Sequence, residues 1–217
     1  MSCQVLTAME FANLSTVAGL SRPTLDEHYQ LYTGFVDKAN KLTEKICERQ
    51  RARGKLDVSD IANLKGDLQF ALAAARNHEI YFALLGDQKT SIPPKLEAIV
   101  NEAFHSVESF LLDLRMTAIS SRGWAWTVLD MSTNRLWNMT GNQSGHFPIW
   151  NAIPILALDL SDHAYFYDFG IRRGAYVDVV LAHLRWDRVW NNLQAAQAVR
   201  AATPRLVGLP EPLMPAR

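Results

Sequence analysis

The sequence lacks a net charge. Its 22 Lys and Arg residues are balanced by 22 Asp and Glu residues in a chain of 217 residues. Proteins that bind nucleic acid through its phosphates usually carry a basic excess, because basic side chains release counterions from the polyanion. The balance of charges therefore argues against nucleic acid as a partner.

Long uninterrupted apolar runs are also missing. No segment approaches the roughly 20 consecutive apolar residues of a membrane-spanning helix. Residues 1–20 lack the basic start and the continuous apolar stretch of a secretory signal. With 48% hydrophobic residues, the chain can still bury a substantial core. We therefore expect a globular protein without a membrane partner.

Cysteine is scarce, since Cys3 and Cys47 are the only two in the chain. Two cysteines are too few for a disulfide framework in a chain of this length, and neither belongs to a CxxC pair. A reducing compartment is the simplest expectation, and we expect the protein to be cytoplasmic.

Helical periodicity dominates the first part of the sequence. Apolar and aromatic residues recur at three- and four-residue spacing from Thr24 to Ile46 and predict a long first helix. The charged segment 47–60 is a connector, and a second helix is predicted over residues 66–85. Two long consecutive helices favour an antiparallel hairpin, which we assign to a first domain over residues 1–88.

A second domain, residues 89–195, is predicted to begin near the paired prolines Pro93 and Pro94, which stop regular structure. A helix is expected over residues 95–116. The segments GWAWTVLD and RLWNMT are rich in β-branched and aromatic residues, and the intervening MSTN predicts a β-hairpin between them. The apolar segment IPILALD predicts a third strand.

The end of the chain is predicted to hold one closing helix over residues 174–193, followed by a proline-containing tail over residues 196–217. The predicted fold class is therefore α+β. An N-terminal antiparallel helical hairpin precedes an α/β domain with a small antiparallel sheet of about three strands.

A carboxylate follows the third predicted strand without an obvious partner. The segment IPILAL is apolar enough to be buried, yet it runs into Asp159, and an unpaired buried carboxylate costs several kcal/mol. Asp159 therefore needs a cation, a hydrogen-bond network or a metal. The nearby candidates are His28 and His78 on the two hairpin helices, and His163. Taken singly, each histidine is more commonly an ordinary hydrogen-bonded residue than a ligand.

These four residues meet only if the helical hairpin packs against the sheet. Three imidazoles and one carboxylate would then converge where the third strand ends. Neutral nitrogens with one anionic oxygen suit manganese, iron or zinc, and they leave a coordination position open for water or substrate.

Several segments resemble, in the same order along the chain, the iron/manganese superoxide dismutase family. LSRPTLDEHY is similar to the start of the family's first helix, ARNHEIYF to its second-helix ligand motif, and GWAW to its sheet motif. DLSDHAY resembles the family signature, usually D-x-W-E-H-A-Y-Y, and IRRGAYVDVVLAHLRWDRVW resembles the closing segment. The resemblance runs from Leu20 to Asn192.

The resemblance implies the family's fold and its activity, the disproportionation of superoxide to dioxygen and hydrogen peroxide. It implies that His28, His78, Asp159 and His163 ligate one redox-active ion per subunit. Manganese is the expected metal, and iron is the alternative.

The resemblance also implies which residues surround the metal. Gln143 matches the outer-sphere glutamine of the family's manganese enzymes, and Ala74 stands where typical iron enzymes carry theirs. His146 is a rival for the role of Gln143. Trp124 is implied beside the site and Arg173 near the substrate entrance, with ordinary core and surface roles as their alternatives.

The chain departs from the family pattern at the proton path. The family usually has a second histidine one turn after the first ligand and a tyrosine a further turn on. Here Tyr32 stands at the first place, and Phe35 or Val36 at the second. Tyr32 lies on the same helix face as His28, so it either supplies a replacement hydroxyl or packs in the core.

The signature itself is also altered. Ser161 replaces a tryptophan that walls the metal pocket, while Asp162 and Phe166 replace a glutamate and a tyrosine that reach the partner subunit. We expect a homodimer or tetramer with a rewired interface and superoxide as substrate. The alternative is a dismutase-fold protein without dismutase activity, with a structural or interaction role or an altered redox activity.

Overall fold

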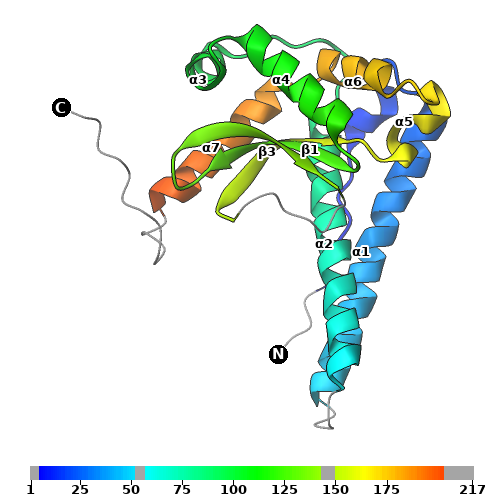
Figure 1. Cartoon of the computed structure of the whole chain (residues 1–217). Coiled ribbons are helices and arrows are strands. Elements are labelled where there is room, and N and C mark those ends of the chain that lie inside the picture. The colour runs from blue at the N-terminus through cyan, green and yellow to red at the C-terminus, as the bar shows by residue number, and fades with distance from the viewer. Residues whose placement is uncertain (1–4, 52–56, 143–149, 203–217) are drawn as a thin grey trace.

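The computed structural model describes residues 5–51, 57–142 and 150–202 (Figure 1). In chain order the elements are the short 3-10 helix η1 (Ala12–Thr16), the helices α1 (Arg22–Arg51), α2 (Val58–Leu84), α3 (Pro94–Phe104) and α4 (Val107–Ser120), the strands β1 (Trp124–Asp130), β2 (Arg135–Gly141) and β3 (Ala152–Asp159), and the helices α5 (Asp162–Phe169), α6 (Arg173–Ala182) and α7 (Trp186–Ala202). The predicted α+β class, with an N-terminal helical hairpin and a three-stranded antiparallel sheet, is confirmed.

Helices α1 and α2 run side by side, and their joined ends project away from the sheet (Figure 1). Buried residues recur along α1 at helical spacing, and Ala39 of α1 packs in one small cluster with Ala71 of α2. Helix α2 begins well before the predicted residue 66, because the side chain of Asp57 accepts hydrogen bonds from the backbone N–H groups of Ser59 and Asp60.

Two predicted helices are each interrupted in the structure. The helix predicted over residues 95–116 is broken at His105, where φ is +71°, and Ser106 caps the start of α4 by accepting a bond from the N–H of Ser109. The closing helix predicted over residues 174–193 is divided into α6 and α7. Between them Leu184 pairs with Leu85 across an antiparallel bridge, a tertiary contact that helical periodicity does not encode.

Helix α7 continues to Ala202 and so extends into the segment 196–217 that the sequence analysis assigned to a tail. The remaining residues, 203–217, lie outside the described part of the chain. No helix among the described residues combines the length and the apolarity needed to cross a membrane.

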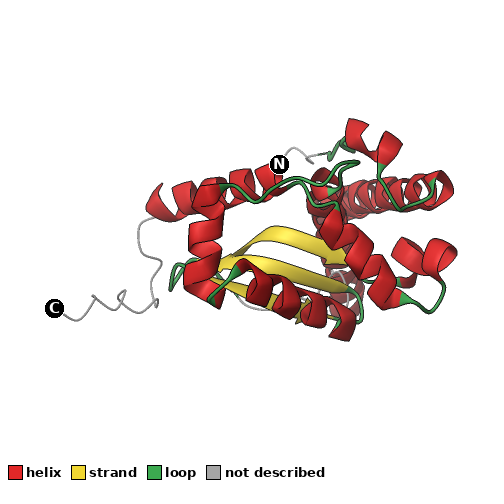
Figure 2. Cartoon of the chain, turned by 90° about the horizontal axis from the view of Figure 1, so that it is seen from above, coloured by secondary structure: helices red, strands yellow, loops and turns green. Residues whose placement is uncertain are grey.

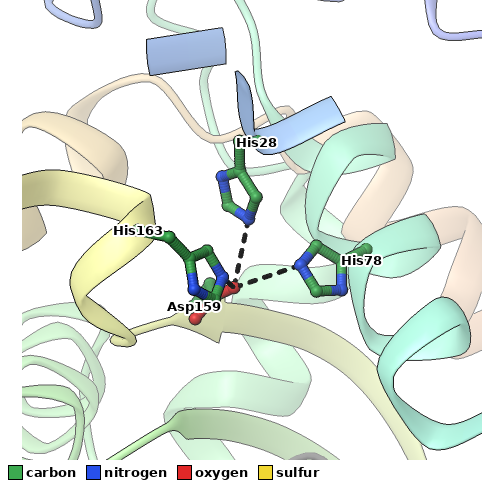
Figure 3. A group of neighbouring side chains, drawn as sticks. All are labelled: His28, His78, Asp159 and His163. Atoms are coloured by element: carbon green, nitrogen blue, oxygen red, sulfur yellow. Dashed lines mark hydrogen bonds and ion pairs between the residues drawn. The ribbon is translucent and has the colours of Figure 1, made fainter. Parts of the chain in front are cut away.

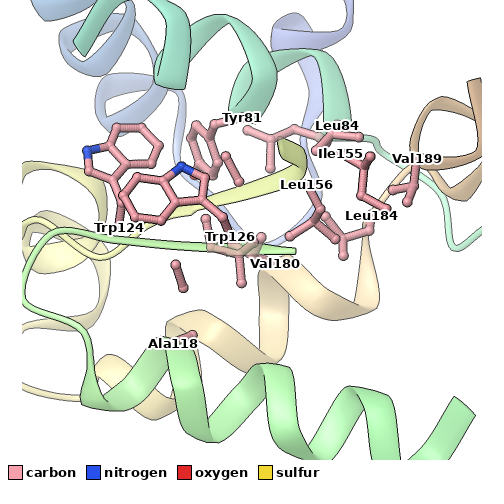
Figure 4. Close-up of a cluster of buried hydrophobic side chains, with 14 of the residues drawn as sticks. Tyr81, Leu84, Ala118, Trp124, Trp126, Ile155, Leu156, Val180, Leu184 and Val189 are labelled. Carbon is pink, nitrogen blue, oxygen red and sulfur yellow. The ribbon is translucent and has the colours of Figure 1, made fainter. Parts of the chain in front are cut away.

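Strand β1 lies at the centre of the sheet, whose order is β2-β1-β3 with both pairs antiparallel. Helices surround the sheet when it is seen from above (Figure 2). Figure 4 shows Trp124 and Trp126 of β1 on the face covered by Tyr81 of α2, with Ala118 of α4 on the opposite face. Burial of both faces explains why β1 is almost continuously apolar. This packing brings the centre of α2 next to the end of β3, where Asp159 lies.

Candidate metal centre

Four side chains from four different elements converge at the end of β3 (Figure 3). The Nε2 atoms of His28 on α1 and His163 on α5 each lie 3.1 Å from Oδ2 of Asp159. The Nε2 atom of His78 on α2 lies 3.5 Å from the same oxygen. One ligand atom from each of the four residues falls within 4.8 Å of the others. The structure thus brings together all four ligands predicted from the sequence.

The cluster is buried on one side and open on the other. Asp159 is 0% exposed, His28 2% and His78 1%. The side chain of His163, by contrast, is 37% exposed. Solvent therefore reaches the cluster from the side of α5, the helix that carries His163.

The hydrogen bond of His78 determines which of its ring nitrogens can bind a metal. Its Nδ1 atom lies 2.7 Å from the backbone carbonyl oxygen of Ala74, one helical turn earlier. A carbonyl only accepts hydrogen bonds, so Nδ1 carries the proton, and in the neutral ring Nε2 presents a lone pair. This Nε2 atom is buried and has no hydrogen-bond partner among the described residues.

Electrostatics keep this nitrogen deprotonated and the carboxylate charged. Burial lowers the pKa of His78 to about 4. Burial alone would raise the pKa of Asp159, but hydrogen bonds from His163 and His28 outweigh it and hold the pKa below its ordinary value. At neutral pH a lone pair on His78 therefore faces an ionised oxygen. A cation between the two atoms would remove this repulsion, so the donor set fits a metal ion.

The pKa values of the other two histidines also depend on Asp159. Burial lowers the pKa of His28, although its hydrogen bond to Asp159 opposes this. Burial also acts to lower the pKa of His163, but the hydrogen bond to Asp159 outweighs burial and raises it. The negative charge of Asp159 therefore favours the protonated form of both histidines. Its second oxygen, Oδ1, accepts a hydrogen bond of 2.9 Å from the backbone N–H of Ser161, which leaves Oδ2 to face the imidazoles.

Comparison with known proteins identifies the family. Residues 92–192 match a family model described as iron/manganese superoxide dismutases, C-terminal domain. The chain is 30% identical over 184 residues to an iron superoxide dismutase of Cupriavidus metallidurans, with 83% of this chain and 91% of that protein covered. The chain belongs to the iron/manganese superoxide dismutase family. The resemblance predicted from the sequence motifs is therefore confirmed.

Relatives named for either metal match this member of the dismutase family. An iron superoxide dismutase of Tetrahymena pyriformis is 30% identical over 192 residues, covering 83% of this chain and 94% of that protein. The manganese superoxide dismutase 1 of Halobacterium salinarum is 27% identical over 175 residues, covering 79% of this chain and 83% of that protein. Similarity to these relatives does not distinguish manganese from iron.

Aromatic rings enclose the buried side of the candidate metal centre. The ring of Trp124 lies 5.1 Å from that of His78, centroid to centroid, and the ring of Phe82 lies 4.9 Å from that of His28. Phe35 is one of the two residues that stand where the family usually has a tyrosine in its proton path. The centroid of its ring lies 5.6 Å from that of His78. These rings limit the access of water to the predicted ligands. Phe35 has no hydroxyl that could take over the role of the family's tyrosine.

Tyr32 is fully buried on α1, and its ring lies 6.3 Å from that of His78. Its hydroxyl accepts a hydrogen bond of 2.8 Å from the N–H of Met9 and donates one of 3.2 Å to Glu79. Burial raises the pKa of Tyr32 to about 12, so the phenol keeps its proton. Glu79 also pairs with Arg76. The hydroxyl of Tyr32 thus joins the N-terminal segment to the hairpin, and its catalytic role stays a prediction.

Arg173, predicted near the substrate entrance, is held by backbone and side-chain contacts. Its guanidinium donates a hydrogen bond of 2.7 Å to the carbonyl oxygen of Ser121, at the end of α4, and one of 3.2 Å to the hydroxyl of Tyr165. That hydroxyl donates to Asp162, next to the predicted ligand His163. Arg173 therefore links α4, α5 and α6, and its effect on substrate entry remains a prediction.

Two residues of the predicted surroundings, Gln143 and His146, lie outside the described residues. Tyr176 was not predicted from the sequence, yet its hydroxyl donates a hydrogen bond of 2.8 Å to the backbone oxygen of Asp159. No spacing signal pointed to Tyr176, because it lies on a separate helix.

Proposed function

We propose that the protein is a superoxide dismutase, which converts two superoxide anions and two protons into dioxygen and hydrogen peroxide. The observation that carries the proposal is the set of three histidines, two of them buried, around the buried Asp159. Within the described part of the chain, Nε2 of His78 has no hydrogen-bond partner and faces the carboxylate. The names of the relatives support the same activity.

The residues that would hold one metal ion are His28, His78, Asp159 and His163. A manganese or iron ion bound there supplies one-electron redox chemistry, by alternating between its trivalent and divalent states. We favour manganese, with iron as the alternative. Ala74 is buried beside His78 and has no side-chain amide, so the second-helix glutamine typical of the family's iron enzymes is missing.

The protein's own groups would prepare the site for this chemistry. The hydrogen bond from Nδ1 to the Ala74 carbonyl orients the ring of His78, and the N–H of Ser161 orients the carboxylate of Asp159. The aromatic shell excludes water on the buried side. Superoxide would approach from the exposed side of His163.

The second half of the reaction consumes protons, and Tyr32 is our candidate for delivering them. Its hydroxyl holds a proton and is oriented by Met9 and Glu79, and its buried ring lies 6.3 Å from that of His78. A relay through Tyr32 would compensate for the histidine and tyrosine that the family usually carries.

We propose a homodimer as the working form, with a tetramer as the alternative. Helix α5 leaves the side chains of Phe166 and Tyr167 exposed, at 56% and 75%, next to the ligand His163. Ile171 follows at 92% exposure. A second copy seated on α5 would cover these apolar groups and close the open side of the metal site.

The decisive experiment measures the decay of superoxide with purified protein, normalised to the manganese and iron bound in the same sample. We expect fast decay that scales with one metal, and His78→Ala should abolish nearly all of it. His183→Ala is the matched control, since its imidazole bonds the carbonyl of Val179 and it does not belong to the four-residue cluster. Full metal occupancy without accelerated decay would instead favour a dismutase-fold protein that has lost the activity.

A further inference from the structure

Two buried tyrosines connect α2 and α6 beside the metal centre. Tyr81 and Tyr176 are each 1% exposed, and their hydroxyl oxygens lie 2.9 Å apart. The hydroxyl of Tyr176 also lies 2.8 Å from the backbone carbonyl oxygen of Asp159. The two hydrogen bonds therefore connect Tyr81, through Tyr176, to Asp159, one of the predicted metal ligands.

The hydrogen-bond inventory sets the direction of this chain. A carbonyl oxygen has no proton to give, so Tyr176 donates its single hydroxyl proton to Asp159. Tyr81 must then be the donor in the bond between the two phenols. Bonds that point the same way polarise one another, which strengthens the chain in a buried setting.

The same two side chains also contact other parts of the centre. The ring of Tyr81 lies 5.3 Å from that of His28, and Tyr81 follows His78 by one turn of α2. The ring of Tyr176 stacks at 5.5 Å on Tyr165, within the helix that carries His163. The pair thus touches or adjoins every element that supplies a ligand.

The hydrogen bonds of Tyr81 and Tyr176 help to fix the backbone at the end of β3. After Asp159 the N–H of Leu160 bonds the carbonyl oxygen of Gly123, on the side of β1. The carbonyl of Asp159 itself is bound by Tyr176, a side chain from α6. Movement of that carbonyl would displace the carboxylate relative to the three imidazoles.

We propose that Tyr81 and Tyr176 are positioning residues of the metal centre, which hold Asp159 in place and thereby set the affinity for the metal. Neither acts on substrate, since both act through the ligand. The proposal rests on the proposed function only in requiring that a metal binds. Partners that orient a ligand from behind typically contribute 10–100-fold to metal affinity.

The test is the binding of Mn²⁺ to the full-length protein, measured by competition with a chelator, together with the electron paramagnetic resonance spectrum of the bound ion. We expect Tyr176→Phe to weaken binding by about 10–100-fold and to alter the spectrum. Tyr81→Phe should have a smaller effect of the same sign. Because Tyr81 acts through Tyr176, the double variant should bind no more weakly than Tyr176→Phe alone.

Thr90→Val is the matched control. The hydroxyl of Thr90 donates to the carbonyl of Leu184 at 2.9 Å and accepts from the N–H of Trp186, at the junction of α6 and α7. Its loss should lower thermal stability and leave Mn²⁺ affinity unchanged. If Tyr176→Phe does not fold, Tyr81→Phe alone decides the question.

Wild-type affinity and an unchanged spectrum in Tyr176→Phe, or in Tyr81→Phe if Tyr176→Phe does not fold, with reduced stability like that of Thr90→Val, would show a purely structural pair and overturn the proposal. If the losses of Mn²⁺ affinity in the two single variants add up in the double variant, Tyr81 does not act through Tyr176, and the proposed series of hydrogen bonds is wrong. If the unmodified protein binds neither manganese nor iron, the proposed function fails as well. The two failures are therefore distinguishable.

Discussion

The Nε2 atom of His78 lies 3.5 Å from Oδ2 of Asp159 and, in the part of the chain that the structure describes, has no hydrogen-bond partner, although both residues are buried. Because Nδ1 of the same ring is committed to the carbonyl of Ala74, the facing atoms are a lone pair and an ionised oxygen. Such a pair is costly when buried and becomes favourable around a cation. The relationship supports the proposal that a metal ion binds at this cluster.

Removal of the metal should destabilise the fold. A ligand present at 1,000 times its dissociation constant adds about 4 kcal/mol to the free energy of unfolding. For a chain of this size that corresponds to a melting temperature roughly 8–16 °C higher. Differential scanning calorimetry of chelator-treated and manganese-reconstituted protein measures this difference. Equal melting temperatures would contradict a metal bound at this cluster.

Asp159→Asn should remove the metal with little change in shape. The amide keeps the size of the side chain but lacks the charge that the three imidazoles surround. We expect at least about a tenfold loss of metal affinity, by analogy with other changes around ligands, and a parallel loss of superoxide decay. Asp187→Asn, at an exposed ion pair with Arg185, is the control and should leave both unchanged. Retention of metal by Asp159→Asn would refute the ligand assignment.

Tyr32→Phe tests the replacement proton path. Loss of a positioned proton donor typically costs about 10²-fold or more in rate, so superoxide decay should fall steeply while metal content stays constant. Tyr29→Phe is the control, because its hydroxyl also bonds Met9, in a hydrogen bond that is exposed, while its ring is half-buried like a packing residue. If both variants lose only stability, Tyr32 is a packing residue that fastens the N-terminal segment.

Phe166→Glu should disrupt the proposed dimer. A buried charge on α5 would be unpaired in an interface formed by two copies of this helix. Analytical ultracentrifugation should show a shift toward the monomer. Leu112→Glu, at an exposed position of α4, is the control and should leave the assembly intact. An unchanged dimer in Phe166→Glu would place the interface elsewhere.

Much of the site could be predicted because local patterns carry it. His28 lies on the buried stripe of an amphipathic helix, and Asp159 ends an apolar strand, so each position follows from periodicity and burial. The family motifs then connected these residues with His78 and His163. The domain boundary at residue 88 and the cytoplasmic location stay predictions.

Other features depended on contacts between distant segments. The division between α6 and α7 follows from the pairing of Leu184 with Leu85, and the chain of hydroxyls joins Tyr81 to Tyr176 across 95 residues. The sequence by itself determined the fold class and the residues predicted as ligands, because helical and strand periodicity are local and the family motifs mark the ligand positions. Only the tertiary structure decided which nitrogen of His78 faces Asp159 and which side chains hold that carboxylate, because hydrogen-bond partners are chosen when separate elements pack together.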